Sequence, residues 1–160
     1  LGAHRLVHND FTPNFKQTLQ PLLDENNSNP SRISVFNLWR RFDKDGVDAP
    51  FALCDSRTIS EKELIPTDLF NYGKQEENTE TLADENGFTV EIYQSMNSDD
   101  HQWYFYPKMN REEVVMFKTY DSNEKPFMPT LHSAFDDAVH AREGATPRES
   151  IEVRAICFYD

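Results

Sequence analysis

The sequence predicts a mainly β domain built around a closed or double-layered sheet. Short runs rich in aromatic and β-branched residues recur along the 160 residues, as strands require. Several runs are apolar on both faces. In ISVFNLW (33–39), for example, Val35 and Phe36 point to opposite sides of a strand and both favour burial, which is typical of a strand held between two layers.

The expected strands are seven runs in chain order: HRLVH (4–8), RISVFNLW (32–39), PFALCD (50–55), FTVEIYQ (88–94), HQWYFYP (101–107), EEVVMFKTY (112–120) and SIEVRAICFY (150–159). Helical patterns are confined to NFKQTLQPLLDE (14–25) and SEKELIPTDLF (60–70), and in the second Ser60 and Glu63 match a capping box. Both helices are expected at the periphery. The polar stretch 71–87 is expected to form a surface excursion between strands.

The length and net charge of the chain limit the kinds of partner that it is expected to have. A chain of 160 residues is expected to be a single domain, 1–160. The net charge of -12 argues against nucleic acid or an anionic membrane as partner, and no apolar run approaches the roughly 20 residues of a membrane span. Cys54 and Cys157 lie in apolar segments and are expected to fill the core, so we expect a cytoplasmic protein acting on a small molecule.

The first candidate site is His8-Asn9-Asp10. On an extended backbone, residues i and i+2 project to the same face about 6.5–7 Å apart, so an imidazole and a carboxylate can converge on one metal ion. A surface histidine beside an aspartate is the alternative interpretation. The motif opens the chain almost at once, and we expect a natural N-terminal segment to be missing before it.

A third metal ligand is expected at His132, in PTLHSAFDDA. Two histidines and one carboxylate on one side of an ion leave the other side open for oxygen and a chelating co-substrate, which favours iron(II). The same ligands also suit zinc, so a zinc-dependent hydrolase or isomerase stays an alternative.

The final strand carries a candidate co-substrate site. Arg148 and Ser150 share one face of it, and a guanidinium with a hydroxyl suits the distal carboxylate of a 2-oxo diacid such as 2-oxoglutarate. Arg154 has the same parity and is the reserve candidate for that carboxylate.

Three further residues are candidates for the walls of a substrate pocket. Asn37 and Trp39 share one face of their strand, and Lys118 lies among apolar neighbours, where a cation must be paired or must line a cavity. The alternatives are a core tryptophan and a lysine at the edge of the core.

Taken together, the segments VHNDFTP, FNLWRRF, FALCDSRTI, HQWYFYPKM, EEVVMFKTYDS, LHSAF and PRESIEVRA resemble, in order, the secondary-metabolism oxygenase family that contains the cephamycin 7α-hydroxylase component and the fungal gibberellin desaturase. The resemblance implies a double-stranded β-helix (jelly-roll, cupin-like) fold. It also implies an iron(II)/2-oxoglutarate-dependent dioxygenase that uses dioxygen to hydroxylate or desaturate a small-molecule natural product.

By the same resemblance, His8, Asp10 and His132 bind the metal and form the catalytic centre, while Arg148 and Ser150 bind the co-substrate. Members of that family have a sizeable segment before the His-x-Asp motif. The remaining alternative is a non-catalytic cupin-like domain that binds a ligand in the same cavity.

Overall fold

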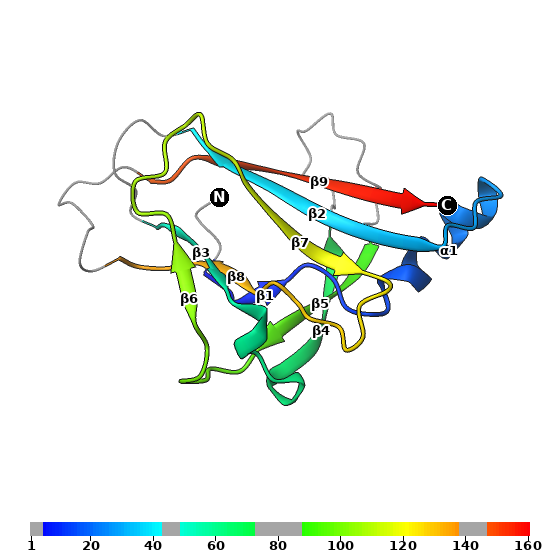
Figure 1. Ribbon diagram of the computed structural model, residues 1–160, viewed down its shortest axis with the longest axis horizontal. Coiled ribbons are helices and arrows are strands. Elements are labelled where there is room, and N and C mark those ends of the chain that lie inside the picture. Colours follow the sequence, from blue (N-terminus) through cyan, green and yellow to red (C-terminus); the bar gives the residue numbers. More distant parts are fainter. Residues whose placement is uncertain (1–4, 43–48, 73–87, 138–146) are drawn as a thin grey trace.

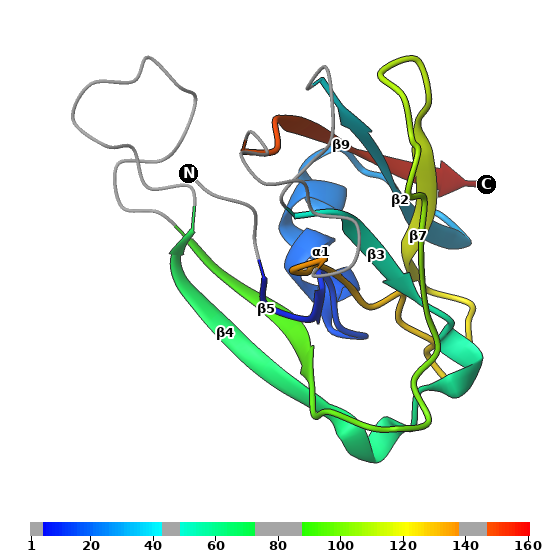
Figure 2. The ribbon, with the colours of Figure 1, turned by 90° about the vertical axis from the view of Figure 1, so that its left-hand side faces the viewer.

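The computed structural model describes residues 5–42, 49–72, 88–137 and 147–160, and its architecture is shown in Figures 1 and 2. Its elements are one α-helix, α1 (Phe15–Glu25), two short 3₁₀ helices, η1 (Ser56–Thr58) and η2 (Glu61–Glu63), and the strands β1 (His8–Asn9), β2 (Arg32–Arg41), β3 (Phe51–Cys54), β4 (Leu64–Tyr72), β5 (Phe88–Ser95), β6 (Trp103–Phe105), β7 (Val115–Asp121), β8 (His132–Ala134) and β9 (Ser150–Tyr159). The mainly β class predicted from the sequence is confirmed.

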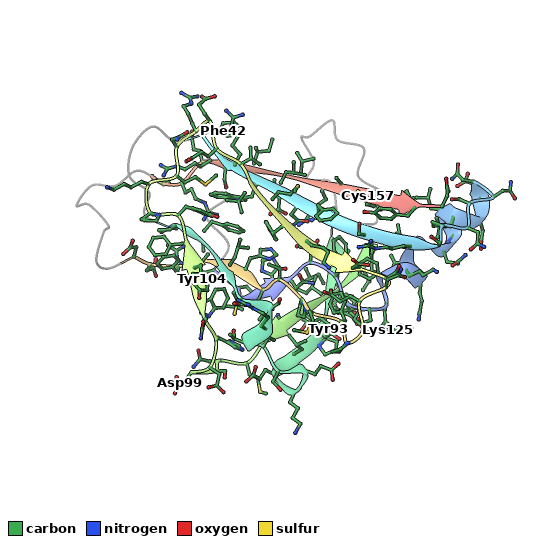
Figure 3. All side chains as sticks on the ribbon, in the orientation of Figure 1. Phe42, Tyr93, Asp99, Tyr104, Lys125 and Cys157 are labelled. Atoms are coloured by element: carbon green, nitrogen blue, oxygen red, sulfur yellow. The ribbon has the colours of Figure 1, made fainter. Side chains whose placement is uncertain are left out.

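The strands form two antiparallel sheets. The larger has the order β4-β5-β1-β8-β3-β6 and the smaller the order β7-β2-β9. In Figure 1 the smaller sheet lies above the strands β1 and β8, and in Figure 3 side chains fill the space between the two sheets. β1 is short but central, because it pairs with β5 on one side and with β8 on the other.

β2 and β9 are paired along their whole length, from Arg32 opposite Tyr159 to Arg41 opposite Ser150. The odd-numbered residues of β2 are buried and face the larger sheet, because successive side chains of a strand alternate between its faces. Ile33 and Val35 join Leu19 and Leu23 of α1 in one apolar cluster. α1 therefore covers one end of the space between the sheets, as the pattern of residues 14–25 predicts.

The outer face of the smaller sheet departs from the sequence prediction that β2 lies between two layers. Val35 is fully buried, but Phe36 on the opposite side is only half-buried. Met116 and Val153, which lie on the same outer face, are more than half exposed. Within the described residues, a second layer covers only the inner face of this sheet.

The predicted helix over residues 60–70 is wrong. Ser60 and Glu63 do form the capping box, but it caps a single 3₁₀ turn, Glu61–Glu63, and β4 begins at Leu64. Pro66 prevents a helix from continuing through this segment. It is tolerated in β4 because β4 is the edge strand of its sheet, where a missing N–H need not remove a hydrogen bond between strands. Of the expected excursion at 71–87, residues 73–87 lie outside the described part of the chain.

In the described part of the chain, no helix has the length and apolar character needed to cross a membrane. Both cysteines are free thiols. Cys54 is buried, as expected, whereas Cys157 on β9 is only half-buried (Figure 3).

Candidate metal centre

Two histidines and an aspartate converge on one side of the larger sheet. His8 on β1 is directly opposite His132 on β8, and Asp10 follows His8 by two residues. One ligand atom from each of the three lies within 4.8 Å of the others. His8 Nε2 is 3.6 Å from Asp10 Oδ1, and His132 Nε2 is 3.9 Å from Asp10 Oδ2. The strand pairing thus unites two sequence motifs that are far apart in the chain.

Both imidazoles are held in the orientation that a metal ligand needs. His8 Nδ1 lies 2.7 Å from the carbonyl oxygen of Leu6, and His132 Nδ1 lies 3.0 Å from that of Thr130. A carbonyl oxygen only accepts, so each Nδ1 carries the proton and donates it. This leaves the lone pair of each Nε2 directed toward Asp10, and a backbone carbonyl behind the ring is a common second partner of metal-binding histidines.

Burial sets the charge of the cluster. Burial lowers the pKa of His132 to about 4, so this imidazole is neutral at pH 7, the form that binds metal. Burial alone would raise the pKa of Asp10, but the charge that His132 gains in acid, the charge of Arg154 and the hydrogen bonds from Arg154 and Asn37 lower it. At neutral pH the arginine remains charged and Asp10 is a carboxylate.

The three residues line a cavity of about 670 Å³ between the two sheets. Arg148, Ser150 and Arg154 line it from the side of β9, as their shared parity predicts. Trp39 also lines it and stacks on Phe51, with ring centroids 4.5 Å apart. The cavity therefore brings together the metal-ligand candidates and the co-substrate candidates.

Arg148 is fixed at the cavity wall by two contacts. Its guanidinium lies over the ring of Trp39, 5.2 Å from the centroid, and donates to the carbonyl oxygen of Ala49 at 2.6 Å. Such a stacked guanidinium presents its remaining N–H groups in a defined direction. Trp39 thus supports the arginine as well as filling the core.

Arg154, the reserve candidate for the co-substrate carboxylate, instead contacts the metal-ligand candidate Asp10. It forms a two-point interaction with Asp10, from Nε to Oδ2 at 3.1 Å and from a terminal nitrogen to Oδ1 at 2.9 Å. The same terminal nitrogen is 2.9 Å from Glu152 Oε1. Glu152 was not singled out from the sequence, although it shares the parity of Arg148, Ser150 and Arg154, which was the available clue.

The other two pocket candidates lie behind or outside the cavity wall. Asn37 is fully buried and donates to Asp10 Oδ2 at 2.5 Å. Lys118 forms ion pairs with Asp121 and Glu124, each at 3.3 Å, and is absent from the cavity lining. Lys118 pairs with Phe36 on the outer face of the sheet, where Met116 is also largely exposed, so its apolar neighbours in sequence did not indicate burial.

A family model described as "Oxidoreductase/YMDC permease-like domain" matches residues 2–158. The chain belongs to this family. Among curated proteins, the chain is 31% identical over 157 residues to the "Fe(II)/2-oxoglutarate-dependent dioxygenase nvfI" of Aspergillus novofumigatus, covering 96% of the chain and 52% of that relative. It is 27% identical over 132 residues to the "Hydroxylase/desaturase asaB" of Aspergillus flavus, covering 81% of the chain and 57% of that relative.

Among solved structures, the chain superposes on the "iron and alpha-ketoglutarate-dependent endoperoxidase NvfI" W199F variant with a TM-score of 0.73 and 28% identity, covering 98% of this chain and 52% of that one. These neighbours confirm the predicted jelly-roll class and the resemblance to secondary-metabolism oxygenases. The chain spans about half the length of the curated relatives it matches.

Proposed function

We propose that this chain is an iron(II)/2-oxoglutarate-dependent oxygenase that hydroxylates or desaturates a small-molecule natural product. The observation that carries the proposal is the convergence of His8, Asp10 and His132 on the wall of a cavity that Arg148 and Ser150 also line. Relatives named for iron(II) and 2-oxoglutarate support it.

The three candidate ligands fit iron(II). The donor set combines two imidazole nitrogens with one carboxylate oxygen, and the imidazole of His132 is neutral at pH 7. Among the described residues, these three side chains form a group with the spacing of metal ligands. Such a set leaves coordination positions for a co-substrate and oxygen. Iron(II) with 2-oxoglutarate supplies oxidising power by coupling oxidation of a C–H bond by dioxygen to decarboxylation of the co-substrate.

In this proposal Arg148 and Ser150 bind the distal carboxylate of 2-oxoglutarate. Both line the cavity at the start of β9, Ser150 as its first residue and Arg148 two residues before it, and Arg148 is anchored by Trp39 and the carbonyl of Ala49. A guanidinium and a hydroxyl together supply several donors to one carboxylate, and the energy of charge-assisted hydrogen bonds holds the co-substrate in one orientation. Its other end is then free to chelate the metal.

The remaining cavity suits an organic substrate. Its volume of about 670 Å³ falls within the range of small-molecule sites, and apolar groups such as Phe11, Phe15 and Ile92 are part of its lining. The net charge of -12 disfavours nucleic acid as partner. Two free thiols are compatible with a reducing, cytoplasmic setting, which stays a prediction.

We also treat residues 1–160 as one domain. Both sheets contribute to the cavity: the ligand candidates lie on or directly after β1 and on β8, while the co-substrate candidates lie on β9 or directly before it.

The decisive experiment is an anaerobic titration of the metal-free protein with iron(II) and then 2-oxoglutarate. We expect the visible charge-transfer band of an iron(II)–2-oxo acid chelate, and its loss in Arg148→Ala at the same co-substrate concentration. A folded protein that binds iron but develops no band, and leaves 2-oxoglutarate unchanged in the presence of oxygen, would refute the oxygenase and favour a metal- or ligand-binding domain.

A further inference from the structure

The carboxylate of Asp10 is held from the opposite sheet. Asn37 and Arg154 are direct partners in the β2–β9 pairing, and both donate to Asp10, which directly follows β1 of the larger sheet. Asp10 Oδ1 accepts from Arg154, and Oδ2 accepts from both Arg154 and Asn37. Both oxygens are therefore oriented before any metal arrives.

A second carboxylate lies within reach of the same groups. Glu152 Oε1 accepts from Asn37 at 3.0 Å and from Arg154 at 2.9 Å, so one amide nitrogen and one guanidinium join Glu152 to Asp10. Burial and the charge of Asp10 raise the pKa of Glu152, while Arg154 lowers it. Two carboxylates this close repel each other unless a cation lies between them.

The amide of Asn37 is fixed in turn. Its oxygen accepts from the hydroxyl of Thr119 at 3.1 Å, and the carbonyl oxygen of Thr119 accepts from the side chain of Asn9. Asn37 and Asn9 are fully buried. Both N–H groups of Asn37 are consequently directed at the two carboxylates, whereas Arg154 is 38% exposed and supplies the only charge in this group of donors to Asp10.

We propose that Arg154 is a positioning residue of the metal site, with two effects: it orients the Asp10 carboxylate toward the two histidines, and it holds the Glu152 carboxylate outside the ligand set. The inference rests on the proposed function only in taking His8, Asp10 and His132 as ligands. Arg154 serves the metal through Asp10 and does not bind the co-substrate. Partners that orient a metal ligand typically change metal affinity about 10- to 100-fold when removed.

The test is a titration of the metal-free protein with Co(II), without 2-oxoglutarate, followed through the ligand-field bands, whose intensity and position report the coordination of the ion. We expect Arg154→Gln to weaken Co(II) binding about 10- to 100-fold and to change the bands as Glu152 enters the ligand set. Arg154→Lys keeps a charge but loses the planar fork, so an intermediate affinity is expected. In Glu152→Gln/Arg154→Gln the wild-type band shape should return while the affinity stays low.

Arg32→Gln is the matched control. Arg32 makes an equivalent two-point interaction with Asp121 on the same sheet but does not line the cavity, so its loss should leave Co(II) binding unchanged. Circular dichroism establishes that each variant is folded.

Wild-type affinity and bands in a folded Arg154→Gln protein would overturn the proposal, as would tighter binding, which would make Arg154 a competitor of the metal. Weaker binding with unchanged bands would uphold the orienting effect and refute the exclusion of Glu152. If the wild-type protein bound Co(II) but formed no 2-oxoglutarate chelate, the oxygenase would fail while this inference stood. If it bound no Co(II), both would fail.

Discussion

His8 and His132 are direct partners in the antiparallel pairing of β1 with β8, and their ring centroids lie 4.3 Å apart. Directly opposite residues of an antiparallel pair project to the same face with neighbouring Cβ atoms, so the pairing itself sets the spacing of the two imidazoles. Asp10, two residues beyond His8, reaches the same face. A slip of one residue would turn either histidine away, so the register of this short strand fixes the site.

Removing a metal-ligand candidate should abolish both metal binding and the stabilisation that it brings. At a metal concentration about 100 times Kd, a ligand that binds only the folded state adds about 2.7 kcal/mol, which corresponds to a rise in Tm of about 5–10 °C for a chain of this size. We expect this rise with Fe(II) or Co(II) in the wild-type protein and none in Asp10→Ala or His132→Ala, measured by thermal unfolding.

The matched control for these variants is His101→Ala. The His101 side chain is also buried and paired with a carboxylate, that of Glu63, at 2.9 Å, but it does not line the cavity. His101→Ala should be less stable than the wild type without metal, yet metal should raise its Tm as much as it raises that of the wild type. A rise of wild-type size in Asp10→Ala would exclude Asp10 as a ligand.

Arg148→Lys should weaken 2-oxoglutarate binding while leaving metal affinity unchanged. Lysine keeps the charge but loses the planar guanidinium that stacks on Trp39. Losing charge-assisted hydrogen bonds worth about 1.5–3 kcal/mol should raise the Kd for 2-oxoglutarate about 10- to 100-fold. The measurement is a 2-oxoglutarate titration of the iron(II) protein by absorbance.

Arg40→Lys provides the comparison. Arg40 also lies over an aromatic ring, that of Phe42, and donates to a backbone carbonyl, that of Arg111, but outside the cavity lining. Its variant should bind 2-oxoglutarate as the wild type does. Equal effects of the two substitutions would mean that Arg148 acts only on the stability of the fold.

Acid should destabilise the protein in part through Asp121. Its hydrogen bonds and ion pair with Arg32 lower the pKa of this buried carboxyl from 3.8 to about 2. A folded-state pKa below the unfolded one gives stability that is present above about pH 4 and is lost as pH falls through about 2. The loss should be about 1–2 kcal/mol, because Arg32 is partly exposed to solvent.

Denaturant unfolding between pH 5 and pH 2 measures this contribution. Asp121→Asn should be less stable than the wild type at pH 5, and the difference should shrink as pH falls. A constant difference across this range would show that the carboxylate charge contributes nothing.

The sequence was most informative where short-range geometry decides the structure. The spacing of His8 and Asp10 and the shared parity of Arg148, Ser150 and Arg154 follow from the alternation of side chains along a strand, and the structure places all five on one cavity. The helix at 14–25 likewise follows from local pattern.

Features that depend on long-range pairing could not be obtained this way. Residues 64–72 form a strand because β5 offers them an edge, although a capping box precedes them. Lys118 was expected at the cavity because of its apolar neighbours, but Met116 lies exposed on the outer face of the smaller sheet, and only the strand pairing shows that Lys118 shares this face. The interaction of Arg154 with Asp10 joins residues 144 positions apart, and only the packing of one sheet on the other reveals it.

This separation along the chain has a consequence for biosynthesis. During translation the segment with His8 and Asp10 is made more than a hundred residues before the strand with Arg154. Closing so long a loop carries an entropic cost and places the contact late in folding. The two carboxylate oxygens of Asp10 are therefore not held by Arg154 until β9 has docked, so tight metal binding at this centre would report that docking step.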